Sequence, residues 1–389
     1  MAKHGTRREP GRAVVTTVSR LCAAMESIAP LHAAADWDNV GLLIGDASWP
    51  VRRLLLTIDL MPSVLDEAVV GRCDAIVAYH PPIFRGVKSL RPERASQEGV
   101  AAAALSERIA VYSPHTALDA APGGTNDTLA ALAGISGAAP FTPARDPLQR
   151  CKLVTFVPEN DLERVAAALF EAGAGRIGDY SHCSFRLQGQ GTFLGGPETN
   201  PAIGRRGCLE RVAETRLEVL FDRRTTSVVI DALRRSHPYE EPAFDIYSLD
   251  AAPLASLGQG RMGEFARPTS VAALARSLAR QIGVNGVSIV GSPGARVRRG
   301  FVCVGAAGSL PFEIPGVSLG EGDVVITGEI RHHDALQYAR SGTAAIALGH
   351  WASERPVLQP LASRLRGLLK GLSIIVSRRD LDPFRILTS

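Results

Sequence analysis

Short apolar runs alternate with amphipathic segments along most of this chain. Residues 52–60, 74–80 and 109–115 are rich in Ala, Val, Ile and Leu, which is typical of strands buried on both faces of a sheet. Predicted helices follow the first two runs, at 62–70 and 96–108. This alternation predicts an α/β fold with a mostly parallel sheet and helices on both of its faces.

The pattern changes in the middle of the chain and then returns. Between residues 148 and 252 the predicted order of elements is strand, helix, strand, strand, helix and strand, which is the order of a ferredoxin-like unit. From residue 253 onward helices and apolar strands alternate again. We therefore expect a discontinuous outer α/β domain, formed by residues 1–147 and 253–389, which is interrupted by a ferredoxin-like α+β insert at 148–252.

Three of the predicted strands end on a histidine. "DAIVAYH" ends on His80, "RIAVYSPH" on His115 and "AAIALGH" on His350. Asp119 follows His115 by four residues, and Glu354 follows His350 by the same interval. The carboxyl ends of strands in an open α/β sheet face one crevice, so these side chains predict a site for zinc, iron or manganese in the outer domain. The alternative is that each histidine is satisfied in the core and that the pairs are helix-surface neighbours.

"TGEIRHHD", residues 327–334, supplies a fourth strand end. Glu329, His332 and His333 are candidates for proton transfer in the same cleft. The alternative is that the HHD stretch opens an exposed helix. Asp59, which ends "LLLTID", is a further candidate to line this cleft. Asp38 and Asn39 either form hydrogen bonds near the cleft or belong to a turn before the next strand.

Two glycine-rich stretches also stand out. "GQGRMG", residues 258–263, matches G-x-G-x-x-G, but "EFARPT" separates it from the next predicted helix. A dinucleotide-binding fingerprint follows a strand and opens a helix directly, so we do not expect a nucleotide cofactor here. "GAAGS", residues 305–309, follows a predicted strand, and it either cradles an anion with its backbone N–H groups or forms a tight turn.

Composition narrows the class of protein. Hydrophobic residues make up 46% of the 389 positions, charged residues 21%, and the formal net charge is +4, as in an ordinary globular protein. Aromatic content is 5% and no basic stripe is interleaved with aromatics, which argues against nucleic-acid binding. The six cysteines form no C-x-x-C pair, and no run of about 18 apolar residues or signal region occurs. We expect a cytoplasmic protein without a membrane span.

Several stretches, in this order along the chain, resemble the Nif-three-like family, also labelled GTP cyclohydrolase type-2-like. They are "WDNVGLLIGD", "YHPPIF", "HTALD", "GGTND", "GQGRMG", "TGEIRHHDAL" and "GHWASE". Together they span nearly the whole outer domain. The insert, with "HPYEEPAFDIY" at 237–247, is similar to the trimerising domains of the nitrogen-regulator-P-II and copper-tolerance-A type that longer bacterial members carry.

The resemblance implies a dinuclear centre with two divalent metal ions per subunit and a toroidal assembly, typically a homohexamer. It places four ligands on His80, Asp119, His350 and Glu354. His115 matches a histidine beside that centre and is a ligand candidate as well.

Tyr79 departs from the usual family pattern, because two adjacent histidines generally end this strand and Tyr79 replaces the first of them. A phenol with a pKa near 10 is a poor ligand while it is protonated, so Tyr79 either binds weakly or hydrogen-bonds a water at the centre. Full occupancy of the second metal position depends on this residue.

Two functions of different kinds fit these observations. The first is a metal-dependent hydrolase of a small-molecule, nucleotide-like substrate, with Glu329, His332 or His333 shuttling protons. The second is a non-catalytic metal-binding scaffold or regulator, which the ferredoxin-like insert favours. Neutralising Glu354 or Asp119 separates them, because only an enzyme loses turnover. Nucleic-acid binding by a toroid is a third function, which the composition does not favour.

Overall fold

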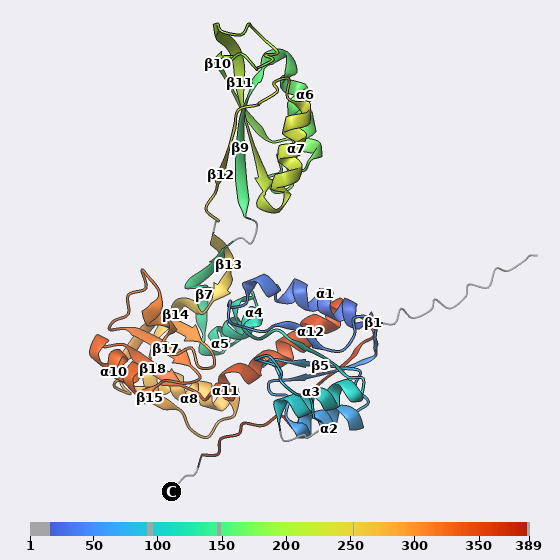
Figure 1. Ribbon diagram of the computed structural model, residues 1–389. Coiled ribbons are helices and arrows are strands. Elements are labelled where there is room, and N and C mark those ends of the chain that lie inside the picture. Colours follow the sequence, from blue (N-terminus) through green and yellow to red (C-terminus); the bar gives the residue numbers. More distant parts are fainter. Residues whose placement is uncertain (1–15, 92–95, 146–148, 252, 387–389) are drawn as a thin grey trace, which may run out of the picture. The chain divides into compact units, whose positions relative to one another are not determined.

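The computed structural model describes residues 16–91, 96–145, 149–251 and 253–386 (Figure 1). The chain divides into two compact units. The outer unit comprises Met1–Ala144 and Leu254–Ser389, and the inserted unit comprises Arg145–Pro253. The structure is a mixture of helices and several sheets, which confirms the predicted α/β class.

The outer unit contains two separate sheets, where the sequence indicated one. The first has five strands in the order β19-β4-β5-β6-β2, and all neighbours are parallel except β2 and β6. Its strands are β2 (Gly41–Ile44), β4 (Arg53–Thr57), β5 (Ala75–Ala78), β6 (Ala110–Ser113) and β19 (Ser373–Val376). One apolar cluster joins a face of this sheet to α1 (Val18–Ile28) and α12 (Leu358–Leu368). Another joins the opposite face to α2 (Pro62–Val70) and α3 (Gln97–Ser106).

The second sheet of the outer unit has six strands in the order β15-β18-β17-β16-β14-β7. Only β16, β17 and β18 run parallel to one another, and the remaining pairs are antiparallel. Its strands are β7 (Ile135–Ala139), β14 (Arg261–Ser270), β15 (Ser288–Val290), β16 (Arg296–Cys303), β17 (Asp323–Thr327) and β18 (Ala344–Ala347). Helices α5 (Thr125–Ala133) and α8 (Val271–Ile282) pack against one face, and α10 (His332–Ser341) packs through Tyr338 against the other.

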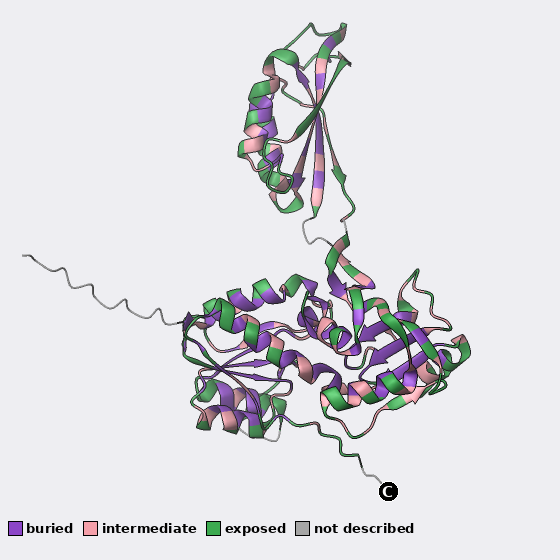
Figure 2. Ribbon diagram, turned by 180° about the vertical axis from the view of Figure 1, so that it is seen from behind, coloured by how far each residue is buried: buried purple, intermediate pink, exposed green. Residues whose placement is uncertain are grey.

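The prolines after His80 determine where β5 stops. All four residues of β5 are buried, and the ladder continues past it, since the N–H groups of Tyr79 and His80 donate to the carbonyl groups of Thr57 and Ile58. Pro81 and Pro82 have no backbone N–H, so the ladder cannot extend further. The strand therefore ends with His80 at the carboxyl edge of a sheet whose strands are largely buried (Figure 2).

The inserted unit is a four-stranded sheet with two helices. Its elements follow one another as β9 (Arg150–Pro158), α6 (Leu162–Glu171), β10 (Ser184–Leu194), β11 (Leu209–Asp222), α7 (Thr226–Ser236) and β12 (Phe244–Ser248). The strand order is β10-β11-β9-β12, with every neighbour antiparallel. Apolar side chains of both helices form one core with alternate residues of β9 and β11. The order of elements is therefore βαββαβ.

The GQGRMG stretch lies at the turn between β13 (Pro253–Gln259) and β14, and the next helix, α8, starts only at Val271. Its glycines serve close packing, because a Cβ on Gly258 would stand 2.2 Å from the carbonyl oxygen of Thr142. Arg261 is buried and binds Asp127 through Nε at 2.6 Å. Its guanidinium also donates to the carbonyl of Ala120, at the end of α4 (His115–Ala120). The motif thus supports the helix that carries Asp119.

Two shorter pairings complete the described strands, between β1 (Thr16–Thr17) and β3 (Pro50–Val51) and between β13 and β8 (Thr142–Arg145). Among the described residues, no helix has both the length and the apolar character that a membrane crossing requires.

Candidate metal centre

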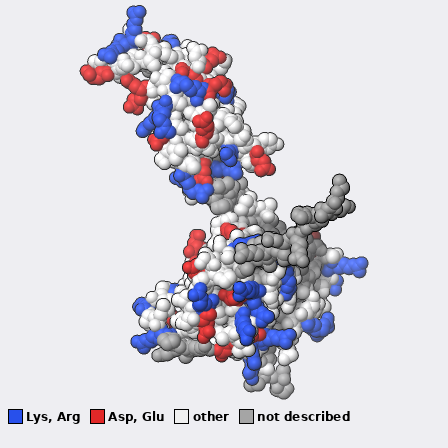
Figure 3. All heavy atoms as spheres, turned by 90° about the vertical axis from the view of Figure 1, so that its right-hand side faces the viewer, with Lys and Arg blue, Asp and Glu red and all other residues white. Residues whose placement is uncertain are grey.

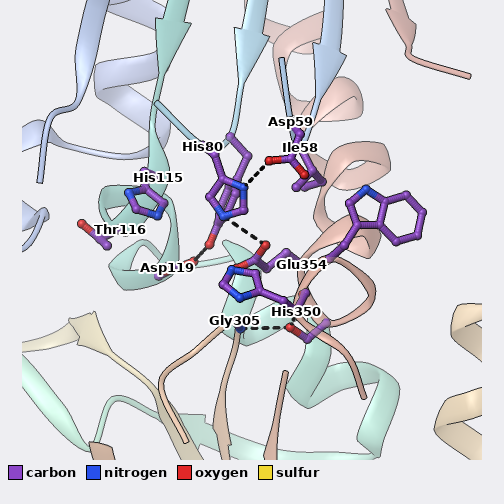
Figure 4. Close-up of polar contacts among 12 residues, drawn as sticks. Ile58, Asp59, His80, His115, Thr116, Asp119, Gly305, His350 and Glu354 are labelled. Atoms are coloured by element: carbon purple, nitrogen blue, oxygen red, sulfur yellow. Dashed lines mark hydrogen bonds and ion pairs between the residues drawn. The ribbon is translucent and has the colours of Figure 1, made fainter. Parts of the chain in front are cut away.

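Three side chains from two sheets converge at the carboxyl ends of β5 and β18 (Figure 4). His80 follows β5, while His350 and Glu354 are the first and last residues of α11 (His350–Glu354), which follows β18. One ligand atom from each of the three lies within 4.8 Å of the others. His80 Nε2 lies 3.3 Å from Glu354 Oε2, and His350 Nε2 lies 3.2 Å from Glu354 Oε1. The carboxylate of Glu354 therefore stands between the two imidazoles.

The opposite nitrogen of each histidine ring is held by a second carboxylate. His80 Nδ1 lies 2.9 Å from Asp59 Oδ1, and His350 Nδ1 lies 3.0 Å from Glu329 Oε1. A carboxylate on Nδ1 fixes the ring orientation and directs Nε2 toward the shared centre, as in histidines that bind metals. His115 is held in the same way, since its Nδ1 lies 2.7 Å from Asp38 Oδ1.

The donor set fits a cation. Glu354 is only 2% exposed, and its buried Oε2 faces His80 Nε2 at 3.3 Å but receives no hydrogen bond of good geometry. A buried carboxylate oxygen without a donor is costly unless a charge compensates it. Gly305 approaches so closely that a Cβ there would stand 2.4 Å from Glu354 Oε1 and 3.2 Å from His350 Nε2. Two imidazoles, a shared carboxylate and space kept by a glycine can hold zinc, iron or manganese.

The carboxylates also control protonation. Burial disfavours the charged form of His80, but the bonds with Asp59 and Glu354 outweigh it and raise its pKa to about 10. The bond with Glu354 is the main cause that raises the pKa of His350 above its ordinary value. Burial would raise the pKa of Glu354, yet the bonds with His350 and His80 hold it below the ordinary value. The centre is thus built to hold positive charge between its carboxylates.

Tyr79 and Asp119 form a pair next to this group. Tyr79 is 1% exposed, and its hydroxyl donates to Asp119 Oδ1 at 2.5 Å. Burial and the carboxylates of Asp119 and Glu354 raise the pKa of Tyr79 well above its ordinary value, so the phenol keeps its proton. Burial raises the pKa of Asp119 to about 6, although the bond from Tyr79 opposes this shift. One oxygen of Asp119 is therefore occupied by a hydrogen bond.

His115 begins the short helix α4, which brings Asp119 back to the same side one turn later. Its φ of 31° lies in the left-handed region, which a non-glycine residue adopts only when its surroundings require it. The bond to Asp38 supplies part of that requirement. The His115 ring centre lies 5.3 Å from that of His80, so His115 flanks the centre without belonging to the three-residue group.

The remaining candidates from the sequence occupy different places. Glu329 holds His350, whereas His332 and His333 are exposed at the start of α10, with their ring centres 5.6 Å apart. No contact between these two rings and the three-residue group is found among the described residues. Gly305 donates its N–H to Ser353 Oγ at 2.9 Å, so this part of the GAAGS stretch forms a turn around Glu354.

Asp380 is a supporting residue that the sequence did not reveal. Its buried carboxylate accepts hydrogen bonds from the Ile58 N–H at 2.8 Å, Trp351 Nε1 at 2.9 Å and Arg355 Nη1 at 2.7 Å. It thereby joins the end of β4, which carries Asp59, to the helix that carries His350. No pattern in the chain marks it, because an Asp in a polar segment near the C-terminus is ordinary.

Comparison with known proteins identifies the family of this chain. The model of the Duf34/NIF3 (NGG1p interacting factor 3) family matches residues 16–383. The chain belongs to the Duf34/NIF3 family. The predicted resemblance to Nif-three-like proteins is therefore confirmed, and it covers both units of this family member.

Curated relatives and solved structures extend the match. A "GTP cyclohydrolase 1 type 2 homolog" of Bacillus subtilis is 36% identical over 366 residues, covering 93% of this chain and 96% of that protein. One from Mycobacterium tuberculosis is 38% identical over 347 residues, covering 87% of this chain and 88% of that protein. The crystal structure of a Bacillus cereus protein related to NIF3 has a TM-score of 0.66 and 30% identity, covering 96% of this chain and 100% of that one. A Staphylococcus aureus structure, at 24% identity and a TM-score of 0.78 over 97% of this chain and 100% of that one, shares the fold.

Proposed function

We propose that this Duf34/NIF3 protein binds two divalent metal ions, zinc, iron or manganese, and hydrolyses a nucleotide-like small molecule. The observation that carries the proposal is the shared pattern of the three histidines, each of which has a carboxylate on Nδ1: Asp59, Asp38 and Glu329. The names of the curated relatives support a nucleotide as the class of substrate.

His80, His350 and Glu354 would hold one ion, and Asp119 with His115 would contribute to the second. Metal ions at such a site lower the pKa of a bound water and stabilise negative charge on an attacked group. Asp59 and Glu329 keep the two imidazoles oriented, and the bonded glycine turn keeps Glu354 in place. We propose Glu329, whose side chain is 50% exposed, as a group that accepts or returns a proton through the carboxylate oxygen that does not hold His350, and His332 and His333 remain predictions for that role.

A non-catalytic metal-binding scaffold or regulator is the second candidate function. It is favoured by the Tyr79 hydroxyl, which donates a hydrogen bond to one oxygen of Asp119 and so makes that oxygen less available as a ligand for the second ion. The inserted unit is compatible with a regulatory role as well.

Glu354→Gln tests both functions together. The variant keeps the size of the side chain and removes the charge that both histidines share. Metal affinity should therefore fall about 100-fold or more, which exceeds the 10–100-fold loss expected when a supporting residue is changed. Elemental mass spectrometry should find less metal in the variant. Glu313→Gln, on an exposed residue of the same unit, is the matched control. If Glu354→Gln loses metal while the native protein releases no product from any nucleotide, the scaffold function replaces the hydrolase. Unchanged metal content would contradict the proposed centre itself.

We also propose a homohexamer in the cytoplasm that does not bind nucleic acid. In support of the last point, acidic and basic side chains are interspersed over the inserted unit on the face shown in Figure 3. Sedimentation of the full chain measures the assembly. A mass other than six subunits would overturn the hexamer.

A further inference from the structure

Two exposed aromatic rings flank the centre on the side of His115. Trp37 is 64% exposed and Phe84 is 41% exposed, and their ring centres are 6.0 Å apart. Trp37 also meets the edge of His115, with ring centres 6.0 Å apart and planes at 75°. Large aromatic rings that stay exposed to water do not gain the free energy of burial. Two such rings side by side next to a polar site therefore indicate a binding surface for a ligand.

The pair is held in place by buried polar groups. The side chain of Asp38, next to Trp37, is fully buried and accepts hydrogen bonds from the N–H and hydroxyl of Thr116 at 3.1 and 2.5 Å. Asn39 donates from Nδ2 to the carbonyl of Ile83, the residue before Phe84. The two rings are therefore anchored from both segments, and binding to them costs little ordering of the chain.

The position of the pair restricts what part of a substrate it can hold. His115 lies between Trp37 and the centre, and its ring is 5.3 Å from that of His80. A planar base stacked on Trp37 is thus separated from His80 by the width of another ring, which is the space that a sugar occupies between a base and its phosphate. A base whose own ring atoms reacted at His80 and Glu354 could not stack on Trp37 at the same time.

Resting on the proposed hydrolase function, we propose that the base of a nucleotide stacks on Trp37, with Phe84, whose ring is inclined at 58° to Trp37, against the edge of the base. The reaction at the centre is then hydrolysis of the phosphate ester, not opening of the base ring. Aromatic side chains bind any base through its π-face, which gives affinity for nucleotides as a class. Arg85, the residue after Phe84, is exposed and adds a positive charge to this segment.

The reaction balances without a further reactant. The oxygen of a water molecule forms a bond to phosphorus, and the bond from phosphorus to the ester oxygen breaks. One proton of the attacking water goes to the leaving oxygen, and the other stays on the phosphate product. The products are a nucleoside and inorganic phosphate, with no oxidation or reduction.

The experiment compares metal-loaded full-length protein with Trp37→Ala, Trp37→Phe and a control, Tyr180→Ala, which removes an aromatic ring that is 78% exposed in the inserted unit. Calorimetry measures binding of guanosine monophosphate and of ribose 5-phosphate. Turnover is followed as release of phosphate, the product of ester hydrolysis, and separately as release of formate, the product of opening the base ring. Glu354→Gln supplies the background from contaminating phosphatases. We expect Trp37→Ala to weaken nucleotide binding about 10-fold, with ribose 5-phosphate unaffected and Trp37→Phe close to the native protein.

The outcomes separate this inference from the function on which it rests. Phosphate release with a KM that rises in Trp37→Ala supports both. Phosphate release with an unchanged KM, or release of formate instead, keeps the hydrolase and overturns the inference. Binding that depends on Trp37 without any product overturns the hydrolase function and the ester reaction together.

Discussion

His80 in the outer unit is partly buried and His237 in the inserted unit is buried, and their ring nitrogens have different partners. His80 faces the carboxylates of Asp59 and Glu354. His237 has no carboxylate on its ring, since Nδ1 accepts from the N–H of Tyr239 at 3.1 Å and Nε2 donates to the carbonyl of Phe156 at 3.0 Å. The pKa of His80 is raised to about 10, whereas burial lowers the pKa of His237 below its ordinary value.

The difference shows how one residue type serves two purposes. Carboxylates on both nitrogens prepare a place for a cation, which a metal ion can fill in place of protons. Backbone partners on both nitrogens require a neutral ring that closes a turn. A buried histidine is therefore identified as a metal-ligand candidate by its partners and not by its burial.

Among variants that leave the three-residue group itself unchanged, removing the space at the centre should have the largest effect. In Gly305→Ala the new Cβ would lie 2.4 Å from Glu354 Oε1, so the carboxylate must move away from the two imidazoles. We expect metal affinity, measured by competition with a fluorescent chelator, to fall about 100-fold, as when a metal-supporting group is lost.

The control for this variant is Gly316→Ala, because Gly316 also has a positive φ of 87° but no atom within 4 Å of its Cβ position. Both variants should lose roughly 1 kcal/mol of stability from backbone strain alone. Equal metal affinity in the two variants would show that Glu354 does not need the space at Gly305.

Removing one supporting carboxylate at a time tests whether the carboxylates on His80 and His350 contribute equally to metal affinity. Asp59→Asn should weaken metal binding by about 10- to 100-fold, because the ring of His80 loses the charge that orients it. Glu329→Gln should have the smaller effect, since the side chain of Glu329 is 50% exposed and that of Asp59 is 35% exposed. Isothermal titration with zinc measures both. A larger loss in Glu329→Gln would reverse the order expected from exposure.

The smallest effect concerns pH and the inserted unit. Because the folded-state pKa of His237 lies below the unfolded value of about 6.5, the folded state binds fewer protons, and stability is lost as the pH falls below about 6.5. The slope cannot exceed about 1.4 kcal/mol per pH unit for one group.

Hydrogen exchange of the full chain, corrected for intrinsic rates, should show this loss in peptides from β9 and α7 between pH 7 and 5. His237→Asn keeps an acceptor for the Tyr239 N–H without a titrating ring, so the stability of its inserted unit should vary less with pH. A slope that survives in His237→Asn would assign the effect to another group.

Much of the fold could be predicted from local patterns. The runs that became β4, β5, β6, β16, β17 and β18 are short and apolar, and the helices α1, α8 and α12 show clear periodicity. The division of the outer unit into two sheets was not visible, since strand order depends on which runs pair and not on how apolar they are. Strand β14, with "GEFARPT", was missed because its alternation is weak and it contains Pro268.

The sequence by itself determined which residues stand at strand ends: the histidines after β5, β6 and β18, with a carboxylate one helical turn beyond two of them. Local periodicity suffices for this, because it sets where a strand ends and which side chains come directly after it. Only the tertiary structure decided that Glu354 lies between His80 and His350, that Asp59, Asp38 and Glu329 hold the Nδ1 atoms, and that Tyr79 occupies Asp119. The supporting carboxylates are 21 to 77 residues away from their histidines along the chain, so only the pairing of neighbouring strands within each sheet brings them within hydrogen-bond distance.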